Sequence, residues 1–443
     1  MTKEDELNNE KWFSLIIFLI IDFVQIFFIS IIALDETQPQ IVSFNLSQNN
    51  PLISVALFLG ISFAQLILVY YVTFNMLRSP EMTKLYPDYQ EDKSWQCHYS
   101  RDEIVNLTNQ LANQNHISLD SIYLMRSPLP NAFTFSLPLL GSVVVLHSNL
   151  LDFLDIDEVK SVITHEIGHI KNKDSLVSIF LRLPSFFVDM IYLYVYLRLF
   201  LGAATSLVTG DLTSAFLRAL ILLGFFGLSR IMVLVSRIFL QRASRKAELL
   251  SDIFAAKTTN PVIMINALIR LGQRVEAMSV LIDEIKWLES LNKERSGPIS
   301  TSELTRMMSS YPLDSIDENN AKRVAPEVYL VAKLELLREV YHVDLSDEQI
   351  HSVVNPAVTE LRKQRNLSSQ NDETKVEKTI DWRDSDYNSD HRLTGQELTD
   401  FIKLLKDNPN KMMFDSEIGN SVMLMDHPDF RRRVLSLAEV FSL

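Results

Sequence analysis

The chain has 443 residues, of which 47% are hydrophobic and 22% charged, so it has the composition of a folded protein with room for about three folding units. Its 55 acidic and 42 basic side chains give a formal net charge of −13, and no segment is rich in Lys and Arg, which argues against nucleic acid as a partner. Cys97 is the only cysteine, so an intramolecular disulfide framework is excluded and any metal site has to use His and carboxylate ligands.

Two apolar segments near the N-terminus are each long enough to span a bilayer. Residues 12–34 contain one ionisable side chain, Asp22, and residues 51–74 contain none. A transmembrane helix needs about 20 apolar residues, and neither segment has the basic start and small-residue cleavage site of a signal peptide. We therefore expect a transmembrane hairpin within residues 1–80, rather than two buried helices of a soluble core.

A second pair of apolar segments, residues 176–202 and 212–241, is interrupted by charged side chains. Asp189 and Arg230 lie far from the ends of these segments and need polar partners inside a membrane. A packed membrane hairpin at about residues 176–241 is therefore expected. The sequence leaves open whether all of it spans the bilayer or part of it lines a water-filled cavity.

The basic residues predict the orientation. The connections at residues 35–50 and 203–214 contain no Lys or Arg, whereas residues 75–174 contain eight. By the positive-inside rule, the bulk of the chain and both termini are cytoplasmic, and the two connections are outside. We expect a multi-pass protein of the plasma membrane, in contact with the lipid bilayer.

Residues 158–171, EVKSVITHEIGHIK, have the apolar periodicity of a helix and contain His165, Glu166 and His169. Two histidines at positions i and i+4 project from one face of a helix, so both imidazoles can bind one Zn²⁺ ion. Glu166 would lie beside the open coordination position, where a general base is needed. The pattern is that of a hydrolytic zinc site.

A catalytic zinc ion needs a third protein ligand. A histidine six residues after His169 would be one solution, but that position is Ser175. Glu248 and Asp252 are better candidates, because they lie one helical turn apart: Glu248 could bind the metal, and Asp252 could accept a hydrogen bond from a zinc-bound histidine. Taken alone, the pair would more often be a solvated helix face.

Gly168 lies in the middle of the predicted histidine helix, where glycine is about 1 kcal/mol less favourable than alanine. Close packing of the helix that carries Glu248 would explain a residue without a side chain at this position.

Several motifs together resemble the HtpX-like integral membrane zinc metallopeptidases, which are related to the Ste-type CAAX prenyl proteases. The motifs are HEIGHIKNKD, the apolar pair that follows it, and SRKAELLSDIFAA with the trailing NPVIMINALIRL. Upstream, residues 130–133 look like the family's Asn-Ala motif on a strand beside the active-site cleft. Residues 426–433 are similar to its His-Pro segment with an arginine six residues after the histidine.

The resemblance implies a role for each matching residue. It implies zinc ligation by His165, His169 and Glu248, a base at Glu166, a supporting carboxylate at Asp252, substrate contacts at Asn131 and Ala132, and transition-state stabilisation or bracing by His427 and Arg433. The implied fold is mainly α with a small β-element (α+β), in a polytopic membrane protein with a gluzincin-like domain and one catalytic Zn²⁺.

The expected function is a membrane-embedded endopeptidase that hydrolyses membrane or misfolded polypeptides in quality control, with a zinc-bound water activated by Glu166. The substrate would add as an extended strand beside Asn131. One alternative is a CAAX-type processing protease, which four membrane helices rather than a larger set disfavour. Another is a catalytically silent zinc-containing adaptor, against which the intact Glu166 argues.

The resemblance divides the chain. After the first hairpin, residues 81–272 form the peptidase domain, which contains the second hairpin. Residues 273–420 are a mainly helical insertion with a polar linker at 362–378, and residues 421–443 return to the peptidase domain.

Within the insertion, residues 386–397 have the spacing of a calcium-binding EF-hand loop. The matching side chains are Asp386, Asn388, Asp390, Leu393 and Glu397. Position six should be glycine and is His391. As an alternative, Thr394 and Glu397 form a capping box for a helix at 398–405, and the acidic run is a solvated turn. The capping box is expected, and Ca²⁺ binding is the less favoured hypothesis.

Overall fold

A computed structural model describes residues 2–34, 51–80, 82–86, 98–125, 130–137, 140–175, 177, 185–275, 380–414 and 428–443. Most of the expected insertion, its linker at 362–378 and His427 therefore lie outside the described residues.

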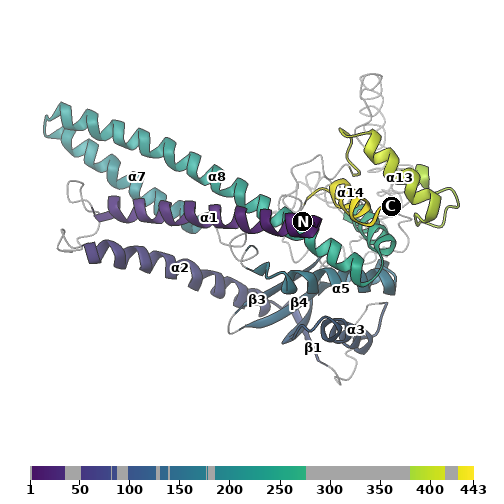
Figure 1. Ribbon diagram of the computed structural model, residues 1–443. Coiled ribbons are helices and arrows are strands. Elements are labelled where there is room, and N and C mark those ends of the chain that lie inside the picture. The colour runs from purple at the N-terminus through teal and green to yellow at the C-terminus, as the bar shows by residue number, and fades with distance from the viewer. Residues whose placement is uncertain are drawn as a thin grey trace, which may run out of the picture.

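Four long helices extend to one side of the molecule (Figure 1). They are α1 (Lys3–Leu34), α2 (Pro51–Leu77), α7 (Ser185–Val208) and α8 (Leu212–Thr258). In the described part of the chain, two helices are long and apolar enough to cross a membrane, Phe58–Leu77 and Leu212–Thr258, and Tyr192–Val208 is a shorter apolar helix. The arrangement of two membrane hairpins stays a prediction.

The helix α8 is continuous over 47 residues, which corresponds to about 70 Å at 1.5 Å per residue. Its first part carries exposed apolar side chains such as Phe216 and Leu223. Its last part is mostly buried and carries Glu248 and Asp252. The apolar segment at 212–241 and the acidic pair, which the sequence presents as separate features, are thus held rigidly on one helix.

A four-stranded sheet lies at the other end of the molecule, with the order β1-β2-β4-β3. The strands are β1 (Met82–Leu85), β2 (Ser121–Met125), β3 (Ala132–Leu137) and β4 (Gly141–His147). β2 and β4 are parallel, and the other two pairs are antiparallel. The strand order leaves β1 and β3 at the edges of the sheet.

The core beside the sheet is formed by α3 (Arg101–Gln114), α4 (Ser148–Phe153) and α5 (Ile156–Lys171). Ile104 of α3 and Ile163 of α5 are completely buried against Val144 of β4. The valine-rich strand β4 is central because it pairs on both sides, and its apolar side chains fix the position of α5.

A second core joins the end of α8 to the C-terminal part of the chain. It contains η2 (Trp382–Ser385), α13 (Gly395–Asp407), α14 (Phe430–Phe441) and the helical residues 261–275. The C-terminal helix α14 therefore lies against the part of α8 that carries the acidic pair (Figure 1). The expectation of a mainly helical protein with a small sheet is confirmed.

Candidate metal centre and active site

The start of helix α5 is held in place by a charged cluster around the buried side chain of Glu158. Asp155 is its N-cap, and the backbone N–H of Asp155 donates to Glu158 Oε2 at 3.0 Å. Nη1 of Arg270 lies 2.6 Å from the same oxygen. This arrangement fixes the start of the helix, and the buried residues Val159 and Ile163 fix its rotation, so that both histidines face α8.

Gly168 lies at a close approach of α5 to α8. A Cβ atom at this position would lie 2.9 Å from Cδ1 of Phe254 and 3.3 Å from the backbone Cα of Ser251. The close packing expected for Gly168 is therefore confirmed, and glycine is used here for proximity rather than for a special backbone angle.

Three ligand atoms converge between the two helices. The Nε2 atoms of His165 and His169 lie 3.2 Å apart. Glu248 Oε2 lies 3.3 Å from Nε2 of His165, and Glu248 Oε1 lies 3.4 Å from Nε2 of His169. The ligand atoms of these residues all lie within 4.8 Å of one another, and their side chains are mostly buried. The structure thus brings the three sequence-predicted ligands together.

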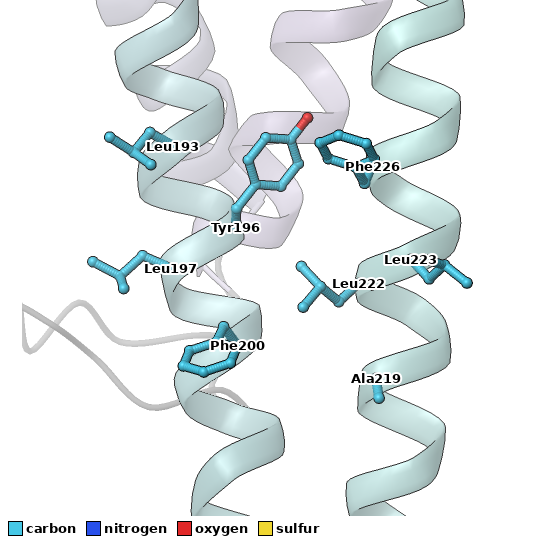
Figure 2. A pocket seen from close by; sticks show the side chains of 8 residues that line it. All are labelled: Leu193, Tyr196, Leu197, Phe200, Ala219, Leu222, Leu223 and Phe226. Carbon is cyan, nitrogen blue, oxygen red and sulfur yellow. The ribbon is translucent and has the colours of Figure 1, made fainter.

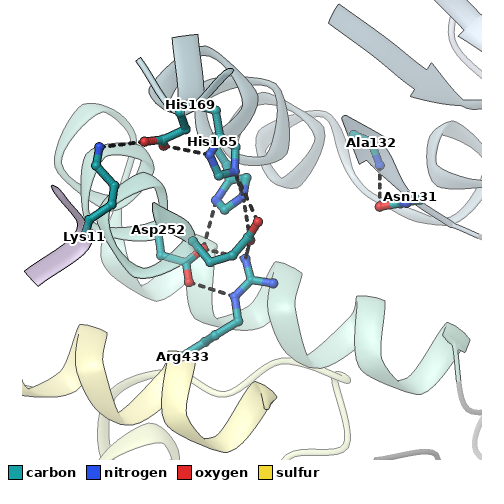
Figure 3. A network of polar contacts seen from close by, with 9 residues as sticks. Lys11, Asn131, Ala132, His165, His169, Asp252 and Arg433 are labelled. Carbon is teal, nitrogen blue, oxygen red and sulfur yellow. Dashed lines mark hydrogen bonds and ion pairs between the residues drawn. The ribbon is translucent and has the colours of Figure 1, made fainter. Parts of the chain in front are cut away.

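The outer nitrogen of each imidazole faces a different carboxylate (Figure 3). Nδ1 of His165 lies 2.9 Å from Oδ1 of Asp252, and Nδ1 of His169 lies 3.0 Å from Oδ2 of Asp174. A carboxylate at Nδ1 keeps a proton there, which leaves Nε2 as the metal-binding atom. Both histidines therefore have their metal-binding atoms directed to the same point.

Asp174 is a site residue that sequence reasoning missed. It is 1% exposed and follows His169 by five residues, as the last residue of the motif HEIGHIKNKD. A buried carboxylate five residues after a histidine is not on the same helix face, so periodicity gives no signal for it. The turn at the end of α5 brings it back.

Arg433 reaches the site from α14 and braces Asp252. Its Nε and Nη2 atoms donate to the two oxygens of Asp252 at 2.7 and 2.6 Å, while Nη2 is 3.7 Å from Glu248. Burial by itself would raise the pKa of the Asp252 carboxyl, but Arg433 outweighs burial and holds this pKa below its ordinary value. Of the two roles that the resemblance leaves open for Arg433, the geometry agrees with bracing.

The charges of the site suit a divalent cation. Four buried carboxylates and two buried cations surround the imidazoles, namely Glu166, Asp174, Glu248 and Asp252 with Lys11 and Arg433. With neutral imidazoles, two negative charges remain uncompensated, and one divalent cation balances them. Two imidazole nitrogens and one carboxylate oxygen are ligands that Zn²⁺ prefers. The residues present therefore fit this ion.

The pKa directions agree with an electronegative site. Burial alone would lower the pKa of both imidazoles, but the neighbouring carboxylates outweigh it. The pKa of His165 is raised by Asp252 and Glu248. The pKa of His169 is raised well above its ordinary value by Glu248 and Asp174. The site thus attracts positive charge strongly.

The remaining predicted site residues lie in different places. Glu166 is buried on α5, next to the first histidine ligand, with 5% exposure. Asn131 and Ala132 lie apart from the histidine cluster, where Asn131 Oδ1 accepts the Ala132 N–H at 2.9 Å (Figure 3). His427 lies outside the described residues, so its predicted role is untested.

The EF-hand-like loop has part of the expected backbone geometry. His391, at position six, has a φ angle of 64°, the left-handed conformation that glycine adopts most easily. Its N–H donates to Asp386 Oδ2 at 3.1 Å. The side chains of Asn388 and Asp390 are exposed.

The last position of the loop serves the helix that follows. Glu397 accepts a hydrogen bond from the backbone N–H of Thr394 at 3.3 Å, so the expected capping box is present at the start of α13. In the parts of the chain that the structure describes, three His, Cys or acidic ligand atoms gather between α5 and α8 but not in this loop. Calcium binding stays a prediction.

Comparison with known proteins agrees with this site. The model of "Peptidase family M48" matches residues 100–440. "Protease HtpX homolog" of Thermoplasma volcanium is 34% identical over 131 residues, which are 30% of this chain and 40% of that protein. The protein of the same name from Sulfurihydrogenibium sp. is 29% identical over 168 residues, 38% of this chain and 54% of that protein.

"Protease HtpX homolog 2" of Sulfurisphaera tokodaii is 39% identical over 72 residues, 16% of this chain and 22% of that protein. The alignments span between about a fifth and about half of the length of these curated relatives.

The fold, the three converging ligands and the family match define the class as metallopeptidase. The chain belongs to peptidase family M48, and within it the similarity is to HtpX-like members.

Proposed function

We propose that the protein is a membrane-embedded zinc endopeptidase. The observation that carries the proposal is the convergence of His165, His169 and Glu248, with a carboxylate oxygen 2.9–3.0 Å from the Nδ1 atom of each imidazole. Catalytic zinc sites use three protein ligands and leave a position open for water or substrate, whereas structural sites use four. The family match to M48 supports the same conclusion.

A bound zinc ion would polarise the scissile carbonyl and lower the pKa of an attacking water to about 7. The protein residues do the remaining work. Glu166 accepts the proton of the attacking water and later delivers it to the leaving amine. Asp252 and Asp174 keep the ligand imidazoles in one tautomer and one orientation during the reaction.

We propose that the substrate polypeptide pairs with the edge strand β3. The backbone N–H of Ser136 points out of the sheet edge, because it donates to Ser175 Oγ at 2.9 Å. Backbone groups alternate in direction along a strand, so those of Thr134 and Ala132 point to the same side. A paired substrate would replace the side-chain acceptors that Ser136 and Ala132 have in this structure. An added strand would be read mainly through its backbone, which lets one cleft accept many sequences.

A bilayer is the proposed environment of the long helices. Their outward side chains are large and apolar, for example Phe63 on α2 and Leu223 on α8. A hollow of about 490 Å³ between α7 and α8 is lined by Leu and aromatic side chains, among them Tyr196, Phe200 and Phe226 (Figure 2). Such a surface suits acyl chains better than water.

The proposed topology is multi-pass with a cytoplasmic active site, as the distribution of Lys and Arg indicates. Because α8 carries both an apolar segment and Glu248, the active site would lie close to the membrane surface. Membrane or misfolded polypeptides are accordingly the proposed substrates, in protein quality control.

The proposal is tested with detergent-purified protein and a casein substrate, comparing wild type with Glu166→Gln. Loss of a general base lowers the rate by about 10²–10⁴-fold, while the zinc content should stay at one ion per chain. Equal activity of both proteins would overturn the proposed mechanism. Zinc binding without cleavage by the wild type would favour the silent adaptor.

A further inference from the structure

We propose that Lys11 is a positioning residue of the metal centre, which acts from the N-terminal helix α1 through Asp174 on the ligand His169. This inference rests on the proposed zinc site. It concerns which part of the chain completes that site.

Lys11 is buried although it begins the apolar part of α1. It is 1% exposed, and its Nζ atom lies 2.6 Å from Asp174 Oδ1 and 2.9 Å from the carbonyl oxygen of Asn172 (Figure 3). The other oxygen of Asp174 lies 3.0 Å from Nδ1 of His169. One buried carboxylate thus joins an ammonium group and a metal ligand that are far apart in the sequence.

The turn at the end of α5 places Asp174 for this contact. The N–H of Asn172 donates to the Gly168 carbonyl at 2.8 Å, and the N–H of Asp174 donates to the His169 carbonyl at 3.0 Å. Between them, Lys173 has a φ angle of 57°, which residues with a side chain rarely adopt. The chain therefore turns back sharply at this point, and Lys11 contacts both Asn172 and Asp174 on either side of it.

A buried ammonium and a buried carboxylate depend on each other, because either one alone would be an uncompensated charge in a low-dielectric interior. Without Lys11, the Asp174 carboxylate would lose both its counter-charge and the contact that fixes its rotamer. His169 would then lose the fixed acceptor at Nδ1 that orients its ring.

The two ligand histidines are supported in the same way from opposite ends of the chain. Arg433 of α14 holds Asp252, which faces His165, and Lys11 of α1 holds Asp174, which faces His169. The metal centre is therefore complete only when both terminal helices are docked. Docking of α1, which is also a predicted membrane helix, is thereby coupled to the geometry of the active site.

The neighbouring residue Glu10 provides a matched control. Its carboxylate lies 2.6 Å from Lys246 Nζ and 3.4 Å from Arg242 Nη2, so it also joins α1 to α8. It is more exposed than Lys11, and the ion pairs given for it involve none of the three proposed metal ligands. Loss of Glu10 removes one partly exposed contact between α1 and α8 and leaves the contacts of Lys11 with Asn172 and Asp174 in place.

The test uses the full-length protein in detergent and compares wild type with Lys11→Met, Lys11→Arg, Asp174→Asn and Glu10→Gln. The readouts are zinc affinity by chelator competition, the visible spectrum after Co²⁺ substitution, and the melting temperature. Lys11→Met and Asp174→Asn should each weaken zinc binding by about 10–100-fold and shift the Co²⁺ bands. Glu10→Gln should change neither the zinc affinity nor the Co²⁺ bands. Lys11→Arg should bind zinc more tightly than Lys11→Met, because it keeps a positive charge beside Asp174.

The double variant Lys11→Met with Asp174→Asn covers the case in which Lys11→Met alone does not fold, because it removes both buried charges together. It should bind zinc as weakly as Asp174→Asn alone, since both residues act through His169. Wild-type affinity and an unchanged Co²⁺ spectrum in Lys11→Met or in the double variant would overturn the inference. Failure of the wild type to bind zinc would instead overturn the proposed function.

Discussion

Arg433 and Asp252, 181 positions apart in the sequence, form a buried two-point ion pair in which Nε and Nη2 donate to the two carboxylate oxygens at 2.7 and 2.6 Å. Such bidentate pairs are stronger and more directional than single contacts. Because Asp252 also faces His165, one of the three proposed ligands, the C-terminal helix would help to order the proposed metal centre.

Replacement of Arg433 tests this contribution. Arg433→Met leaves the buried Asp252 carboxylate without its counter-charge, and removing one partner of a buried pair is destabilising by about 3–5 kcal/mol. We expect a lower melting temperature and a zinc affinity reduced by about 10–100-fold. The exposed neighbour Arg432 is the control, and Arg432→Met should behave as wild type. Equal zinc affinity in both variants would contradict a bracing role.

Gly168→Ala tests the close approach of α5 and α8. The added methyl group would lie 3.3 Å from backbone at Ser251, which cannot move as a side chain can. We expect a loss of about 1–3 kcal/mol in stability from overpacking, although alanine is by itself the better helix former by about 1 kcal/mol. Gly224→Ala on α8 meets open space and should be neutral or stabilising. Thermal denaturation in detergent distinguishes the two variants.

Metal removal should destabilise the wild type more than a ligand variant. A ligand that binds only the folded state stabilises it by RT ln(1 + [L]/Kd), or about 4 kcal/mol at a thousandfold excess over Kd. A chelator should therefore lower the melting temperature of the wild type and leave that of Glu248→Ala unchanged. A wild-type melting temperature that does not respond to the chelator and to added zinc would contradict a metal centre at this site.

We expect the free energy of unfolding to depend on pH because of Glu158, at the start of α5. Burial raises the pKa of its carboxyl to about 7, although Arg270 acts in the opposite direction. The folded protein then binds the proton more tightly than the unfolded chain. The contribution of this group to the stability of the fold is therefore full below about pH 4.5 and is lost as the pH rises to about 7.

The comparison variant for this prediction is Glu158→Gln, which cannot titrate. The free energy of unfolding of wild type relative to the variant should fall by up to about 3 kcal/mol between pH 4.5 and 7, from about 1.4 kcal/mol per pKa unit. Urea denaturation in detergent at several pH values measures it. A difference that does not change with pH, or that rises with pH, would show that Arg270 keeps this carboxyl charged.

The site was predictable from the sequence where spacing alone determines geometry. His165 and His169 share a helix face at i and i+4, and the glycine between them indicated the close contact with a second helix. The sequence alone makes Glu248 only a candidate ligand, from its helical spacing with Asp252, and the family resemblance implies the role, because no local pattern links residues about 80 positions apart.

The roles of Lys11 and Asp174 could not be predicted in the same way. In the sequence, Lys11 is an ordinary basic residue directly before the apolar segment at 12–34, and Asp174 is one of several polar residues after the histidine helix. Only the packed structure shows that the turn after α5 and the start of α1 meet beside His169. Such contacts depend on tertiary packing, which local propensity does not encode.

Zinc K-edge X-ray absorption on the purified protein tests the central claim most directly. We expect one ion per chain, bound by two imidazole nitrogens at about 2.0–2.1 Å and by oxygen ligands, with one oxygen ligand lost in Glu248→Ala or the ion lost altogether. Absence of bound zinc after reconstitution, or an identical spectrum in Glu248→Ala, would contradict a metal centre built between α5 and α8.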